Sequence, residues 1–60
     1  MWTLIYTRVD QTQDSITEAT FSEAVLTARQ FRDYPEVLKV EIYTPDGVLL
    51  ATFTNYKGGV

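Results

Sequence analysis

The chain has 60 residues, a net charge of −3, and neither cysteine nor histidine. A domain of this length buries only about 60% of the surface of its unfolded chain, so oligomerisation is one route to added stability. Without cysteine and histidine there are no disulfides, no thiolate metal sites and no imidazole base. We therefore expect a protein that is not an enzyme and binds no cofactor or metal.

No apolar run is long enough to span a membrane, and the first residues lack the basic and apolar regions of a secretory signal. These features predict a cytoplasmic protein with no membrane partner. The excess of acidic over basic residues, eight against five, argues against binding along the phosphates of a nucleic acid.

Two strands are expected at the start of the chain. Residues 2–9 are rich in β-branched and aromatic side chains and are apolar on both alternating faces, which is typical of a central strand. Residues 10–14 are all polar and predict a hairpin loop. Residues 15–20 then return as a second, less apolar strand.

The spacing of Asp10, Thr12 and Asp14 is that of the opening of a calcium-binding loop. Ser15 then stands where such a loop needs glycine, and Phe21 stands where it needs a bidentate glutamate. We therefore expect a solvated hairpin loop here and no calcium site.

A helix is expected over residues 22–33. Ser22 can cap its start while Phe21 packs onto Leu26, or the start can lie at Thr20 through a capping box. Apolar residues at helical spacing form one stripe, which consists of Phe21, Ala24, Val25, Ala28 and Phe31. This stripe predicts that the helix packs on one face of a sheet.

A second hairpin is expected from residues 37–44 and 48–54, joined by a turn that begins at Thr44. Pro45 suits the second turn position because its φ is fixed, and Gly47 accepts the positive φ that follows. These residues predict a type I turn with a glycine bulge.

The pairing of the two strands decides which side chains share a face. If Thr44 pairs with Val48, Leu50 lies opposite Ile42 and Phe53 lies opposite Lys39. The core face then carries Leu38, Val40, Ile42, Val48 and Leu50. The opposite face carries Tyr43, Leu49 and Phe53, with Lys39 and Glu41 among them.

The order strand, strand, helix, strand, strand predicts a single two-layer α+β domain, with one helix on a four-stranded, mostly antiparallel sheet. The first strand can neighbour the third, giving an all-antiparallel sheet, or the fourth in parallel. The expected bounds are strands at about 2–9, 15–20, 37–44 and 48–54, a helix at about 22–33, and a frayed tail at 55–60 that contains Gly58-Gly59.

Both faces of the second hairpin carry apolar side chains, and this excess is the best functional clue in the sequence. We expect a small protein-interaction module that docks a partner, or a second copy of itself as a homodimer. The contact is expected on the sheet face that the helix leaves free. The expected interface residues are Tyr43, Leu49, Phe53, Lys39 and Glu41.

Two alternative functions stay open. Strand aromatics can stack single-stranded nucleic-acid bases, and the candidates are Trp2, Tyr6, Tyr43 and Phe53. A small acidic inhibitor protein of a mobile element is the other alternative, although a net charge of −3 is low for a mimic of nucleic acid. For catalysis, a carboxylate pair such as Glu18 with Glu41 could meet across the sheet, but nothing in the sequence requires it.

Overall fold

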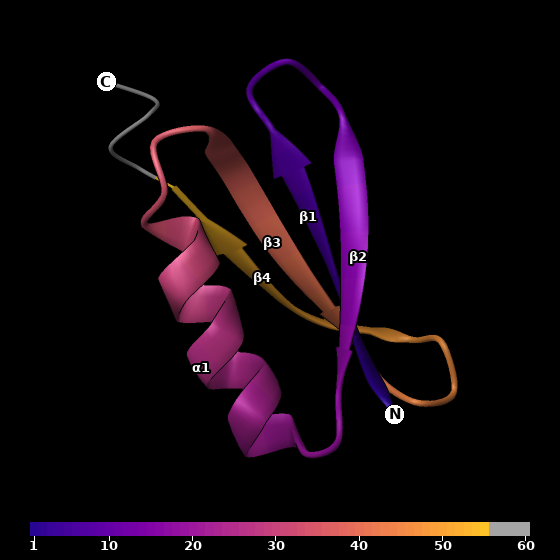
Figure 1. The fold of residues 1–60 in the computed structure, drawn as a ribbon. Coiled ribbons are helices and arrows are strands. Elements are labelled where there is room, and N and C mark those ends of the chain that lie inside the picture. The colour runs from indigo at the N-terminus through magenta and orange to yellow at the C-terminus, as the bar shows by residue number, and fades with distance from the viewer. Residues whose placement is uncertain (56–60) are drawn as a thin grey trace.

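The computed structural model describes residues 1–55 and confirms the predicted two-layer α+β fold (Figure 1). The elements are β1 (Trp2–Arg8), β2 (Gln13–Glu18), α1 (Phe21–Arg32), β3 (Val37–Tyr43) and β4 (Leu49–Thr54). Within the described part, no helix is both long and apolar enough to cross a membrane. The Gly58-Gly59 pair lies outside the described residues.

The four strands form one antiparallel sheet in the order β2-β1-β3-β4 (Figure 1). β1 is central, as its apolar residues on both faces predicted, and it pairs with β3 rather than in parallel with β4. β2 and β4 are therefore the two edges. The helix lies across one face, and no other helix or strand of residues 1–55 covers the opposite face of the sheet.

The helix begins at the alternative cap. Thr20 has an extended backbone, and its hydroxyl accepts a hydrogen bond from the Glu23 backbone N–H at 3.2 Å and donates to the Glu23 carboxylate at 3.1 Å. The prediction of Ser22 as the cap is wrong. The capping box of Thr20 and Glu23 binds the free backbone N–H of the first turn, so the cap lies two residues before Ser22. Phe21 consequently contacts the Trp2 ring, at 5.1 Å between centroids, instead of packing onto Leu26.

The core lies between the helix and the two central strands. Of the residues that the structure describes, six apolar ones are buried: Leu4, Ala24, Ala28, Val37, Val40 and Ile42. The two alanines let the helix approach the sheet closely, because neither side chain extends past its β-carbon. Phe31 lies beside them, with its ring edge-on to Tyr6 at 4.9 Å.

Both hairpins use the same three-residue loop. The Gly47 N–H donates to the Thr44 carbonyl, and the Thr44 N–H donates to the Val48 carbonyl, both at 2.9 Å. Gly47 has a φ of +86°, which confirms the predicted type I turn with a glycine bulge. The β1–β2 loop repeats the two bonds between Arg8, Gln11 and Thr12, again at 2.9 Å.

The register of β3 with β4 differs from the predicted one beyond the first pair. Tyr43 lies opposite Leu49 as expected, but Ile42 then lies opposite Ala51 and Val40 opposite Phe53. Leu50 is an additional residue in β4, so the pairing shifts there by one. The shift exchanges the faces of the rest of β4, because side chains alternate along a strand.

A second irregularity occurs where β3 meets β1. Thr7 pairs with Lys39, but Arg8 pairs with Val37, which leaves Leu38 as the additional residue. Val37 is consequently buried and Leu38 is exposed. The prediction that Leu38, Val48 and Leu50 lie in the core is wrong, and the prediction for Val40 and Ile42 is confirmed.

Asn55 was expected in the frayed tail, and this prediction is wrong. Its side chain is buried, and the amide donates to the carbonyl oxygens of Tyr34 and Val37, both at 3.0 Å. Its backbone N–H donates to the Leu38 carbonyl at 2.8 Å. Hydrogen bonds of Asn55 therefore join the end of β4 to the connection between the helix and β3.

Candidate functional site

The sheet face opposite the helix carries the odd-numbered side chains of β3. Lys39, Glu41 and Tyr43 lie on this face, since Val40 and Ile42 between them point into the core. The Lys39 Nζ lies 4.0 Å from the Glu41 Oε1, and the Glu41 side chain is only 15% exposed. Three of the five predicted interface residues are thus brought together on one strand.

Leu49 joins these residues, and Phe53 does not. Leu49 lies opposite Tyr43 at the start of β4 and is 47% exposed. Phe53 lies opposite Val40, packs against the core, and has the Arg32 guanidinium 5.9 Å from the centre of its ring. The placement of Phe53 on the free face is therefore wrong, because the additional residue at Leu50 turns it toward the helix.

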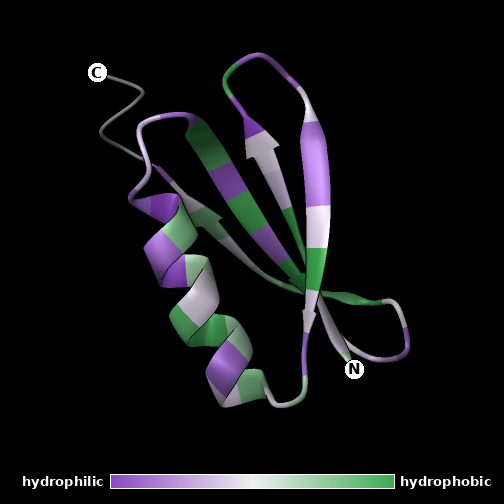
Figure 2. Cartoon of the chain, viewed as in Figure 1, coloured by the Kyte–Doolittle hydropathy of each residue, from purple (hydrophilic) through white to green (hydrophobic). Residues whose placement is uncertain are grey.

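The start of β4 exposes three consecutive apolar side chains, as the hydrophobic colour leading into this strand shows (Figure 2). Val48 is 61% exposed and Leu50 is 51% exposed, on either side of Leu49. We call Val48, Leu49 and Leu50 the apolar segment. The sequence contained a signal for it, because three adjacent apolar residues in a strand cannot all face one core.

The remainder of the free face is rich in hydroxyl groups. Its side chains lie in cross-strand rows defined by the register: Thr17, Thr3, Tyr43 and Leu49; then Ser15, Ile5, Glu41 and Thr52; then Gln13, Thr7, Lys39 and Thr54. The apolar character of this face is thus concentrated at the end where β3 turns into β4. A partner that binds by apolar contact would meet the protein at that end.

The strand aromatics do not form one platform. Trp2 and Tyr6 lie on the helix side, where their rings contact Phe21 and Phe31. Phe53 lies on the same side, and only Tyr43 is on the free face. Base stacking on the free sheet face would therefore rest on one aromatic ring.

The carboxylates of Glu18 and Glu41, which could have met across the sheet, are not brought together. Glu18 lies in the edge strand β2 on the helix side and accepts a hydrogen bond from the Thr27 hydroxyl at 2.6 Å. Glu41 lies in β3 on the free face. Opposite faces of a sheet place the two carboxylates out of reach of a common substrate atom.

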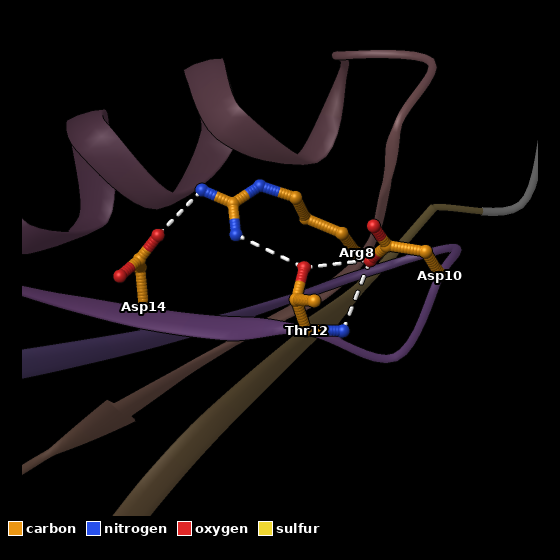
Figure 3. A network of polar contacts seen from close by, with 4 residues as sticks. All are labelled: Arg8, Asp10, Thr12 and Asp14. Carbon is orange, nitrogen blue, oxygen red and sulfur yellow. Dashed lines mark hydrogen bonds and ion pairs between the residues drawn. The ribbon is translucent and has the colours of Figure 1, made fainter.

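The β1–β2 loop contains the densest polar network (Figure 3). The Arg8 guanidinium donates to Asp14 at 2.6 Å and to the Thr12 hydroxyl at 3.2 Å. The Thr12 hydroxyl and backbone N–H donate to Asp10 at 2.6 and 3.0 Å. These hydrogen bonds lower the pKa of Asp10, and the bond to Asp14 raises the pKa of Arg8.

This network gives the loop a structural role. The residues with calcium-loop spacing, Asp10, Thr12 and Asp14, direct their oxygens to one another and to Arg8. The Arg8 guanidinium pairs directly with Asp14, and Asp10 is bound to Thr12, so the oxygens of both carboxylates already have partners within the loop. Across residues 1–55 there is no group of three or more His, Cys, Asp or Glu residues that could hold a metal ion.

The chain matches no protein-family model, no curated protein and no solved structure. Any functional argument therefore rests on its own residues, and the feature that stands out among them is the apolar segment beside Tyr43.

Proposed function

We propose that this protein is a small, non-enzymatic protein-interaction module whose contact surface is centred on the apolar segment and Tyr43. The observation that carries this proposal is the exposure of Val48, Leu49 and Leu50, each by about half, at the start of an edge strand. Contiguous exposed apolar side chains are costly to leave in water and are typical of interaction surfaces.

The polar surroundings of this surface support the same function. Lys39 and Glu41 form an ion pair on the adjacent part of the face, at 4.0 Å, and the rows beyond it carry threonine and serine. An apolar centre with a polar, hydrogen-bonding rim is the usual arrangement at protein interfaces. A stacking surface for nucleic-acid bases has weaker support, since the strand aromatics are divided between two faces.

The proposal is tested by replacing both Leu49 and Leu50 with threonine, which removes the apolar side chains and is itself a β-branched residue that strands favour. The readouts are sedimentation of the purified protein and capture of partners from the source cell. We expect the double variant to lose the association that the wild type shows, with an unchanged circular dichroism spectrum.

The matched control is Leu26→Thr, because Leu26 is also exposed, by 60%, but lies on the helix. We expect this control to keep every association of the wild type. If the double variant and the wild type associate equally in both assays, the apolar segment is not the contact surface and the proposal fails.

A further inference from the structure

The two edges of the sheet differ in their charge. The edge strand β2 contains Asp14 and Glu18, and natural sheets protect edges from other strands with such charges. The other edge strand, β4, contains no charged residue and consists of Leu, Ala, Thr and Phe. Within the described part of the chain, the bulge at Leu50 is the only irregularity of this edge, so residues 51–54 form a regular and uncharged segment.

The register shows which backbone groups of β4 point outward. The Asn55 N–H donates to Leu38 across the β3–β4 pair, and antiparallel pairing alternates bonded and non-bonded positions. Phe53 and Ala51 therefore direct their N–H and C=O groups toward β3. Thr52 and Thr54 direct theirs away from the sheet, where another strand can bind them.

We propose that the strand bound at this edge is β4 of a second copy, paired antiparallel about a two-fold axis at Thr52. This inference rests on the proposed interaction function and names its partner. The two four-stranded sheets would then join into one continuous sheet.

Charge favours a second copy as the occupant. The protein carries a net charge of −3, so association of two copies requires that the contact itself be free of acidic groups. A β4–β4 contact meets this requirement along the whole strand. Pairing of β4 with β2 would instead bring Asp14 and Glu18 to the contact. Such head-to-tail pairing does not close, since it always leaves one β4 edge open to a further copy, whereas a β4–β4 dimer leaves only the acidic β2 edges unpaired.

The side chains select the position of the axis. With Thr52 on the axis, Ala51 lies opposite Phe53 of the second copy, and the small side chain leaves room for the ring. An axis at Phe53 would place the two rings opposite each other. It would also bring together the two Arg32 guanidinium groups, each of which lies 5.9 Å from the centre of a Phe53 ring, and like charges at close range repel.

The first test is Thr52→Pro, measured by sedimentation velocity up to about 1 mM protein, the range that detects even weak dimers. Proline removes the outward N–H without touching the bonds to β3, and edge strands tolerate it at such positions. We expect the wild type to approach twice its 6.9 kDa mass. The dissociation constant of Thr52→Pro should rise about tenfold or more, because two backbone hydrogen bonds cross the axis at Thr52.

The matched control is Ser15→Pro. Ser15 lies at the other end of the same cross-strand row as Thr52, and its N–H also points outward, since the Arg8 N–H bonds to Thr12 in the β1–β2 pair. This variant introduces the same backbone change at the other edge. We expect it to associate as the wild type does.

Cysteine variants test the axis without relying on proline. The chain has no native cysteine, so Thr52→Cys should form a disulfide between copies under mild oxidation, because paired residues on an antiparallel ladder lie at about 5.5 Å between α-carbons. Thr54→Cys lies two residues from the axis and should cross-link at least about tenfold more slowly, since its counterpart in the other copy lies several residues further along the ladder.

The outcomes separate this inference from the proposed function. A wild type that stays at 6.9 kDa throughout the concentration range overturns the second copy as partner. So does a folded Thr52→Pro variant that associates like the wild type, or equal cross-linking of the two cysteine variants. The proposed function survives any of these results if the threonine double variant at Leu49 and Leu50 still loses capture of a cellular protein, and it fails if that capture is unchanged.

Discussion

Gly47 and Gln11 occupy the same position in two hairpin loops of the same geometry, but only one of them is glycine. Gly47 has a φ of +86° and Gln11 a φ of +72°, so both lie in the left-handed region. A side chain there costs about 1–2 kcal/mol because its β-carbon crowds the following carbonyl. The cost of a side chain in this conformation can therefore be measured twice, by adding a side chain at Gly47 and by removing one at Gln11.

Gly47→Val should destabilise the protein by about 1–2 kcal/mol, since a β-branched residue is poorly tolerated at positive φ. Apart from Gly47 and its two chain neighbours, no residue has an atom within 4 Å of a β-carbon built at this position, so the cost comes from the local backbone conformation and not from tertiary contacts. Gly47→Asn should cost much less, because asparagine tolerates this region. Chemical denaturation measures both changes, and equal losses from the two would contradict a left-handed Gly47.

Gln11→Gly should stabilise the protein, by up to about 1 kcal/mol. The change removes the β-carbon from a left-handed position, and the greater freedom of glycine in the unfolded chain offsets part of the gain. The Gln11 backbone N–H donates to the Arg8 carbonyl, and glycine keeps this bond. A melting temperature at or below that of the wild type would show that the gain is absent.

The stabilising effect of Asp10 should depend on pH. Hydrogen bonds from the Thr12 hydroxyl and backbone N–H lower the pKa of Asp10 below its ordinary value of 3.8. A carboxyl with a lowered pKa stabilises the folded state above that ordinary value, and the stabilisation is lost as the pH falls toward the lower pKa. The melting temperatures of the wild type and Asp10→Asn should therefore differ at pH 7 and converge near pH 2, about two units below 3.8. A constant difference would contradict the lowered pKa.

At the scale of the elements, the helix is held by a stripe that runs from Phe21 to Phe31. The predicted stripe is confirmed at Ala24 and Ala28, which are buried. Phe31 is only half-buried, between the rings of Tyr6 at 4.9 Å and Tyr34 at 5.4 Å. The seam between helix and sheet therefore ends in an aromatic cluster that borders on solvent.

Phe31→Ala should cost about 2–3 kcal/mol, less than the roughly 3–5 kcal/mol for a fully enclosed phenylalanine, because part of the ring is already in water. In a domain of this size, the loss should lower the melting temperature by roughly 10–20 °C. Leu26→Ala is the control on the exposed side of the same helix, where we expect a change within about 0.5 kcal/mol. Similar effects of the two changes would place Phe31 outside the seam.

At the scale of the whole molecule, the sheet has one layer of helix and two edges of different character. The acidic residues of β2 are tied within the chain, Asp14 to Arg8 and Glu18 to Thr27, both at 2.6 Å. The β4 edge presents outward backbone groups and begins with the apolar segment. Association through β4 would add burial that a domain of this size lacks on its own.

The melting temperature should consequently rise with protein concentration. Association of folded copies stabilises the folded state by mass action, by about 2.7 kcal/mol when the concentration is a hundred times the dissociation constant. Differential scanning calorimetry from micromolar to millimolar protein measures the effect. Thr52→Pro should show a smaller rise over the same range, because its dissociation constant is higher. A wild type whose melting temperature stays constant would contradict self-association through any surface.

Local chemistry alone determined the order of the elements, the start of the helix, the helix face that packs on the sheet and the conformation of Gly47. A capping box at Thr20, an alanine-rich stripe and a Pro-Asp-Gly turn act over a few residues, so their outcome does not depend on the rest of the chain. The central position of β1 also followed from the sequence, because apolar residues on both alternating faces are more typical of a central strand than of an edge strand.

The tertiary structure decided the strand pairing and the faces of β4. Without the extra residue at Leu50, Thr52 would face the core opposite Val40 and Phe53 would face water. With it, Phe53 and Ala51 pack under the helix. In the sequence, Ala51 and Phe53 alternate with threonines, which favours this arrangement. The pairing extended from the preceding turn instead predicted that Thr52 would face the core and Phe53 would face water.

The register set by the turn and the register favoured by the alternation of β4 therefore disagree. Contact of the sheet with the helix decides between them, because burying Phe53 in place of Thr52 outweighs the cost of a bulge. The same bulge leaves Leu50 in solvent beside Leu49 and Val48. The candidate interaction surface is thus a product of tertiary packing, and the sequence indicated only that more apolar residues were present than one core face could hold.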